Sequence, residues 1–202
     1  ASSQQVPIAL DFNADPVMSA NSFSFSDNQF DAIGLIGSQI TRNSTIKVRA
    51  LGAITNITYV MLSTDITVQT GRTLTIAPGV VIKHSQNNFA YNLFRVDGTL
   101  IMNGKPDSII TITSVKDDAV GNPFDTNKDG NGSTPARNDL GPIFITQSGG
   151  ASSISHAHLK YMGGGYYFSY YGFNNENIRR DAAIVIYNAS PSIRRTVIEN
   201  AE

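Results

Sequence analysis

Two internal alignments show that the sequence repeats itself, and this repetition constrains the fold more than any other feature. Residues 71–79, GRTLTIAPG, align with residues 97–105, DGTLIMNGK, at an offset of 26 residues. Residues 154–162, ISHAHLKYM, align with residues 193–201, IRRTVIENA, at an offset of 39. Periods of this length are typical of solenoids, in which each repeat adds one unit to a stack.

Each repeat contains three short runs of alternating apolar and polar residues, which is the pattern of half-buried β-strands. Only 15% of the residues are charged, and no run of ten or more residues has the period of a helix. The first runs of the repeats are ITVQ, FRVD, IFIT and IVIY, and the second runs begin at Leu74, Leu100, Ile154 and Ile193. The third runs are VVIKH, IITIT, AHLKY and TVIEN. Three strands per turn, stacked on those of the next turn, predict an all-β fold, a right-handed parallel β-helix or solenoid.

Long connections interrupt the coils at one point of the repeat. The third strand of one coil is followed by SQNNFAYNL, that of the next by an insert at residues 115–140, and that of the next by an insert at residues 163–182. All three insertions leave from the same corner of the predicted solenoid. They would therefore stack into one continuous surface, which is often the binding face of a repeat protein.

The two ends of the chain differ from the coils between them. Residues 1–40 lack the three-run pattern, and we interpret them as a cap or the tail of a preceding module, with the β-helix over residues 41–202. The chain stops at IENAE, inside a coil, where an uncapped solenoid exposes apolar side chains and unpaired strand edges. We therefore expect a truncated β-helix whose last coil is covered by further modules of the same polypeptide or by another chain.

Five stretches between residues 45 and 202 carry a resemblance to known proteins. They are DITVQTGRTLTIAPGVVIKH, FRVDGTLIMNG, IITITS, the DTNKDGNGS insert and DLGPIFI. Together they resemble the right-handed parallel β-helix domains of large bacterial cell-surface and secreted proteins, although LGPI stands where such domains usually carry WGGI. The resemblance implies the same fold and an extracellular, adhesin-like role, but this fold also hosts structural fibres, polysaccharide lyases and glycoside hydrolases.

The stretch DTNKDGNGS, at residues 125–133, alternates oxygen-bearing side chains with other residues, as the start of a calcium loop does. Such a loop takes ligands from positions one, three, five, seven and nine, and Gly130 stands at position six, where the chain must turn sharply. The predicted ligands of Ca²⁺ are Asp125, Asn127, Asp129, Asn131 through its carbonyl, and Ser133.

The group that closes this loop is not in its usual place. Ala136 stands at position twelve, where an EF-hand has a bidentate Glu, and no helical pattern flanks the loop. Closure would come from Asp139, or from Asp117 and Asp118 at the loop entrance. The alternative is a hydrated turn, because Asn, Asp and Gly also favour turns without an ion. If Ca²⁺ binds, we expect a structural ion that offsets the ordering entropy of a polar insert.

The second insert carries an aromatic tract, YYFSYYGFNNEN, after three glycines. Tyrosine rings offer apolar area with a hydrogen-bonding edge, which suits a sugar- or partner-binding platform. The candidate ligand-binding residues are Tyr166, Tyr167, Tyr170, Tyr171, Asn174 and Asn175. The alternative is that these rings fold over the coil as a small satellite core.

Composition excludes several classes of function. Cysteine is absent, so the chain has no disulfide, no Cys-ligated metal and no Cys nucleophile. Fifteen basic and sixteen acidic residues leave no basic tract for nucleic acid. No apolar run approaches the roughly 20 residues of a membrane span, and the first residues lack the regions of a signal peptide.

Enzyme chemistry finds weaker support in the sequence, and we assign no catalytic residue. A β-helix lyase would need a basic group beside the cation, for which Arg137, Arg179 or Arg180 could serve. A hydrolase would need carboxylates held on rigid strands, whereas most acids here lie in predicted loops. His156 and His158 would share one face of a strand as a weak metal pair, or serve as ordinary wall residues.

Taken together with this resemblance to bacterial β-helix domains, the sequence predicts an extracellular structural or adhesive β-helix module of a larger bacterial surface or secreted protein. Its expected cofactor is Ca²⁺, and its expected partner is a glycan or a cell-surface molecule bound by the stacked corner loops. A polysaccharide lyase or glycoside hydrolase is the first alternative, and a subunit of a surface filament or fibre is the second.

Overall fold

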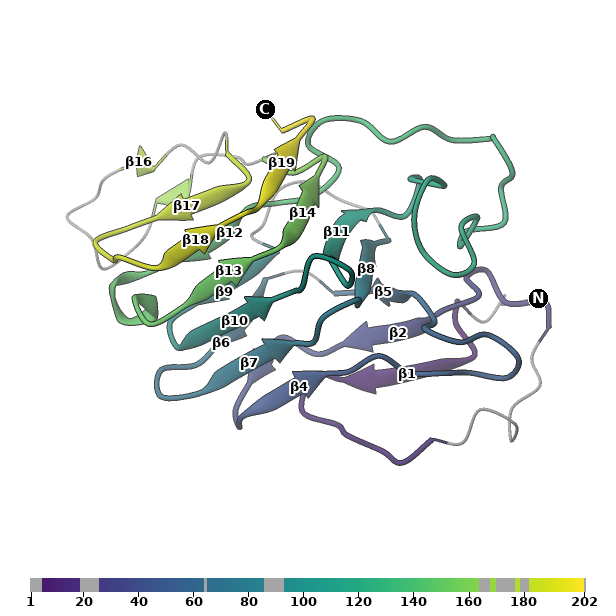
Figure 1. Ribbon diagram of the computed structural model, residues 1–202, viewed down its shortest axis with the longest axis horizontal. Helices are drawn as coiled ribbons and strands as arrows, with labels where there is room; N and C mark the ends of the chain where they lie inside the picture. The colour runs from purple at the N-terminus through teal and green to yellow at the C-terminus, as the bar shows by residue number, and fades with distance from the viewer. Residues whose placement is uncertain are drawn as a thin grey trace.

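Three parallel sheets stack the repeats in the computed structural model of the chain, and the fold is a parallel β-helix (Figure 1). The structure describes residues 5–18, 26–63, 65–85, 93–163, 168–169, 177–178 and 182–201. The prediction of an all-β solenoid from the repeats is confirmed.

Sheet A holds the third strand of each predicted coil and extends it toward the N-terminus. Its seven strands follow the order β1-β2-β5-β8-β11-β14-β19. Their bounds are β1 Ile8–Asp11, β2 Ile33–Ile36, β5 Tyr59–Met61, β8 Val81–His84, β11 Ile110–Ser114, β14 Ala157–Lys160 and β19 Val197–Glu199.

Sheets B and C hold the first and second strands of the coils, with five strands each. Sheet B contains β3 Gln39–Ile40, β6 Ile66–Val68, β9 Phe94–Val96, β12 Ile143–Ile145 and β17 Ile184–Ile186. Sheet C contains β4 Ser44–Ile46, β7 Thr73–Ile76, β10 Thr99–Asn103, β13 Ser153–Ser155 and β18 Ser192–Arg194. A short 3-10 helix, Gln147–Gly149, precedes β13, and an antiparallel pair joins β15 Phe168–Ser169 to β16 Asn177–Ile178.

The strand registers match the two alignments of the sequence. Leu100 pairs with Leu74 across sheet C, as the offset of 26 predicts. Ile154 pairs with Ile193 and Leu159 with Ile198, as the offset of 39 predicts. The repeats in the sequence are therefore the stacked coils of the fold.

The core fills the space enclosed by the three sheets. Because successive side chains of a strand point to opposite faces, every second residue of each strand enters this space. Leu74, Leu100 and Ile154 are fully buried on sheet C, and Ile82 and Ile112 are fully buried on sheet A. Each coil therefore covers the apolar side chains of its neighbours, as expected for a solenoid.

The N-terminal segment contributes strands to these stacks. Although residues 1–40 lack the three-run pattern, β1, β2 and β3 lie in this segment, and Ile8 pairs with Ile33 in sheet A. The described part of the first coil has one strand, in sheet A, which explains why the pattern does not reveal it. That residues 1–40 also cap the solenoid stays a prediction.

The last coil leaves apolar side chains exposed. Ile193, Val197 and Ile198 keep 37%, 54% and 46% of their surface accessible, whereas their partners one coil earlier are more buried. The expected cover for this coil stays a prediction.

The long connections leave from one corner, as predicted. They join sheet A strands to the following sheet B strands, between β8 and β9, β11 and β12, and β14 and β17. The insert at residues 115–140 lies beside sheet A and turns back toward the N-terminal coils (Figure 1).

Candidate cation-binding loop

The first insert is tied to coils that are far away in the sequence. The backbone N–H of Thr58 donates to the carbonyl of Asn122 at 3.0 Å, and the N–H of Asp31 donates to the carbonyl of Thr126 at 3.1 Å. The Nζ of Lys128 lies 2.7 Å from a carboxylate oxygen of Asp31. The insert thus forms a strap from β11 back to the segments that precede β2 and β5.

A buried lysine lies beneath this strap. Lys83 on β8 is fully buried, and its Nζ donates to the carbonyl of Phe124 at 2.6 Å. Burial lowers the pKa of Lys83 to about 8, although the nearby carboxylates of Asp118, Asp117 and Asp125 act in the opposite direction. The carboxylates of the strap therefore lie above a buried lysine.

A buried ion pair joins Asp117 to Lys160, which lies on β14 of the same sheet as Lys83. The Nζ of Lys160 donates to Asp117 at 2.6 Å, and the hydroxyl of Thr113 donates to the same oxygen at 2.7 Å. Burial opposes ionisation of Asp117, but these two hydrogen bonds prevail and lower its pKa. Asp117 is thereby held by the coil wall.

Three other carboxylates converge within the strap. One oxygen from each of Asp118, Asp125 and Asp129 lies within 4.8 Å of the other two. Burial raises the pKa of Asp118, and the charges of Asp125 and Asp129 raise it further. Like charges at this separation repel each other, so a cation bound among them would stabilise the insert.

The loop between these carboxylates has a tight backbone. Both oxygens of Asp125 accept backbone hydrogen bonds, from Asp129 at 3.1 Å and from Gly130 at 3.0 Å. Lys128 and Gly130 have φ values of 58° and 64°, in the left-handed region. The turn that the glycine at position six predicts is therefore present.

Two side-chain oxygens in this loop have no hydrogen-bond partner among the described residues. Oδ1 of Asp118 and Oδ1 of Asn127 are both buried, and neither accepts a hydrogen bond. The amide nitrogen of Asn127 donates to Asp129 at 2.7 Å, and the hydroxyl of Ser133 donates to the same Asp129 oxygen. Calcium takes carboxylate and amide oxygens as ligands, so both unpaired acceptors suit such an ion.

The structure brings together some of the predicted ligands and not others. Asp125, Asn127, Asp129 and Ser133 form one group, which Asp118 joins from the loop entrance. Asn131 is exposed. Asp139 lies elsewhere, because its carboxylate accepts from the Ser114 hydroxyl at 2.7 Å and from the Ala136 N–H at 3.1 Å.

The other candidate residues are distributed as follows. The aromatic-loop residues Tyr166, Tyr167, Tyr170, Tyr171, Asn174 and Asn175 lie outside the described residues.

The two histidines near β14 lie on different segments. His156 precedes β14 with a φ of 46°, so it does not share a strand with His158. The Nε2 of His158 lies 3.1 Å from Glu199. Of the two alternatives for these histidines, the metal pair on one strand face is therefore not formed.

Within the ranges that the structure describes, no helix combines the length and the apolar character needed to cross a membrane. Comparison of the chain with models of protein families, with curated proteins and with solved structures finds no match.

Proposed function

We propose that this chain is an extracellular structural or adhesive β-helix module of a larger bacterial surface or secreted protein, and that Ca²⁺ stabilises its first insert. The observation that carries this proposal is the convergence of Asp118, Asp125 and Asp129 on a strap across the coils. Asn127 and Ser133 supply further oxygens beside them. Asp118 takes the place of the missing ligand at position twelve.

The physical case for calcium rests on the chemistry of these groups. Three carboxylates and an amide oxygen are hard oxygen ligands, which Ca²⁺ binds in flexible geometries of six to eight ligands. The insert has little apolar surface of its own, so an ion would offset part of its ordering entropy. The role of the ion in this proposal is structural, because its ligands all belong to the insert and the ion would hold them in one conformation.

Calcium-dependent melting tests the cation site. We expect Ca²⁺ at 100 times its Kd to add about 2.7 kcal/mol to the free energy of unfolding, which raises Tm by roughly 5 to 11 °C. Asp118→Asn, Asp125→Ala and Asp129→Ala should each weaken this response, and Asp107→Asn, an exposed acid on another loop, should not. An unchanged response in the Asp125→Ala, Asp129→Ala double variant would show that the loop is only a hydrated turn.

An activity assay separates the module from the enzyme alternatives. The chain should bind to its target surface without releasing unsaturated or reducing-sugar products from polysaccharides. Product formation that depends on Ca²⁺ would instead establish a lyase or hydrolase, and end-to-end polymers in solution would establish a filament subunit.

A further inference from the structure

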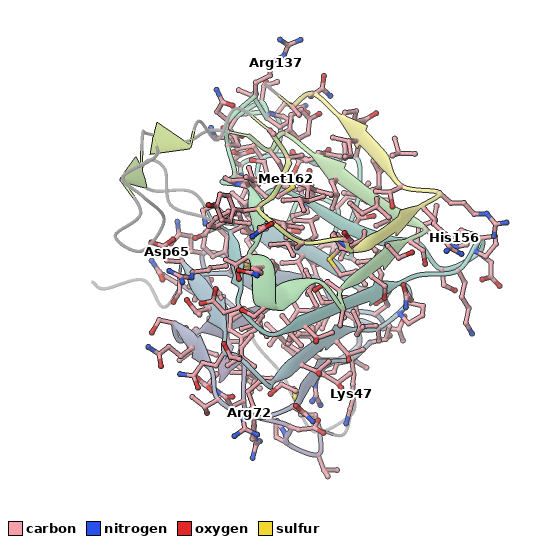
Figure 2. The ribbon with its side chains drawn as sticks, turned by 90° about the vertical axis from the view of Figure 1, so that its left-hand side faces the viewer. Lys47, Asp65, Arg72, Arg137, His156 and Met162 are labelled. Atoms are coloured by element: carbon pink, nitrogen blue, oxygen red, sulfur yellow. The ribbon has the colours of Figure 1, made fainter. Side chains whose placement is uncertain are left out.

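A second polar site lies at the N-terminal end of sheet C, and none of its lining residues belongs to the insert. It is a cavity of about 210 Å³ between the turn after β1 and strand β4. Its lining includes Asn13, Asp15, Arg42, Asn43, Ser44 and Lys47. Figure 2 shows Lys47 on the same side of the molecule as Arg72, which belongs to the next coil.

The wall formed by Asn13 is held in place by several hydrogen bonds. Its side-chain nitrogen donates to Asp11 at 2.8 Å and to the carbonyl of Gln39 at 2.9 Å. Its side-chain oxygen accepts from the N–H of Thr41 at 3.0 Å, and its carbonyl accepts from Arg42. Asn13 thereby ties the turn to the coil below, so the cavity is preformed.

The charges around the cavity leave one cation without a carboxylate. Lys47 and Arg49 both form ion pairs with Asp15, and their hydrogen bonds lower the pKa of this carboxyl. Within the described residues, Arg42 forms no ion pair, and its printed bond reaches a backbone carbonyl. The guanidinium of Arg42 therefore keeps donors for an anion.

The lining selects for a ligand with two kinds of polar group. Arg42 offers donors to an anion, whereas the Asp15 carboxylate accepts hydrogen bonds and repels a ligand made only of acceptors. The ligand must therefore carry an acidic group and hydroxyl donors together. A volume of about 210 Å³ is below the roughly 300–1,000 Å³ of drug-sized sites, and it suits one sugar ring.

A hydroxyl row, in which four of five positions are Thr or Ser, leads away from this cavity along the outer face of sheet C. Thr45, which also lines the cavity, pairs in register with Thr75, and the row continues across the sheet. Its hydroxyl-bearing members are Thr45, Thr75, Ser153 and Ser192, and Ile101 stands between Thr75 and Ser153. Adjacent strands lie about 4.8 Å apart, so the row spans about 19 Å, enough for several sugar units.

We propose that this cavity binds one carboxylate-bearing unit of an acidic polysaccharide, whose chain continues along the hydroxyl row of sheet C. Arg42 contacts the carboxylate, and Asp15 accepts hydrogen bonds from the hydroxyls of the same unit. This site is separate from the proposed cation site and from the aromatic insert.

Calorimetric titration with trigalacturonic acid tests the site, with its carboxyl-reduced trisaccharide and sodium acetate as the other probes. We expect the acidic trisaccharide to bind at least tenfold more tightly than either of them. Arg42→Gln should weaken this binding about tenfold or more, since hydrogen bonds to charged groups are strong. The matched control is Arg72→Gln, an exposed arginine at the same corner one coil later, which should bind as the wild type does.

Four results would overturn the proposal. These are the absence of binding to the acidic trisaccharide, equal binding of the neutral trisaccharide, equal binding of acetate, and equal loss in Arg42→Gln and Arg72→Gln. Thr45→Val removes a hydroxyl from an exposed position and keeps the shape of the side chain, so it should weaken binding without unfolding the chain. Asp125→Ala should leave this binding unchanged, which distinguishes a failure of this site from a failure of the cation site.

Discussion

At the scale of single residues, Lys83 is the most perturbed group beneath the insert. Its ammonium is fully buried and donates a hydrogen bond to the carbonyl of Phe124. Burial lowers its pKa to about 8 from the ordinary 10.5. Between these two values the unfolded chain holds a proton that the folded chain has released, so the free energy of unfolding rises with pH.

We predict that the wild type gains about 1 to 2 kcal/mol of stability between pH 8 and pH 10 relative to Lys83→Met. Above about pH 10 the stability of both proteins should fall together, because burial raises the pKa of Tyr59 to about 12 and the unfolded tyrosine ionises first. Urea unfolding with a chelator present measures the free energy of unfolding in both pH ranges. Lys105→Met, at an exposed lysine, is the control, and equal pH dependence in Lys83→Met and the wild type would contradict the prediction.

At the scale of elements, two coils approach each other closely at the corner between sheets B and C. A Cβ on Gly98 would lie 2.2 Å from the carbonyl oxygen of Gln69 and 2.3 Å from that of Arg72. Both are backbone atoms of the preceding coil, so neither can move without disturbing the stack. Glycine is required at this position because of the close approach of two backbones.

Gly98→Ala should therefore destabilise the chain by about 3 kcal/mol or more, at the upper end of overpacking costs. Gly150→Ala is its matched control, because a Cβ there would meet its nearest atom at 3.6 Å and its φ is −61°. That variant should change the free energy of unfolding by no more than about 1 kcal/mol. The midpoints of chemical denaturation compare the two, and similar midpoints would refute the packing argument.

At the scale of the whole molecule, the strap adds long-range contacts to a fold that otherwise relies on neighbours. In a solenoid each coil contacts only the next one, so its ends can open independently of its middle. Here Lys128 reaches the carbonyl of Asn28, a separation of 100 residues. The strap also contributes Val115 to a small apolar cluster with Phe30 and Val60 outside the main core.

Replacing residues 119–136 by a short Gly-Ser linker should selectively loosen the N-terminal coils. The linker can close the gap because the hydroxyl of Ser114 and the carboxylate of Asp139 are only 2.7 Å apart. In hydrogen exchange, we expect β1, β2 and β5 to lose protection while β10 and β13 keep theirs. A uniform loss over all coils, or none, would show that the strap does not hold the N-terminal end.

The sequence by itself determined the coils of this protein. The side-chain period of two along each strand and the offsets of 26 and 39 residues predicted which residues pair, and Leu74 and Leu100 lie in that register. These features are local or periodic, so they are visible without a structure. The alternation of Asp125, Asn127 and Asp129 similarly predicted part of the candidate cation site.

Only the tertiary structure decided how the loops lie on the coils. It brought Asp118 to Asp125 and Asp129, turned Asp139 toward Ser114, and buried Lys83 under the strap. It also formed the cavity between Asn13 and Arg42, which are 29 residues apart. These contacts depend on where an aperiodic loop folds back onto distant strands, and no repeat or period in the sequence encodes that direction.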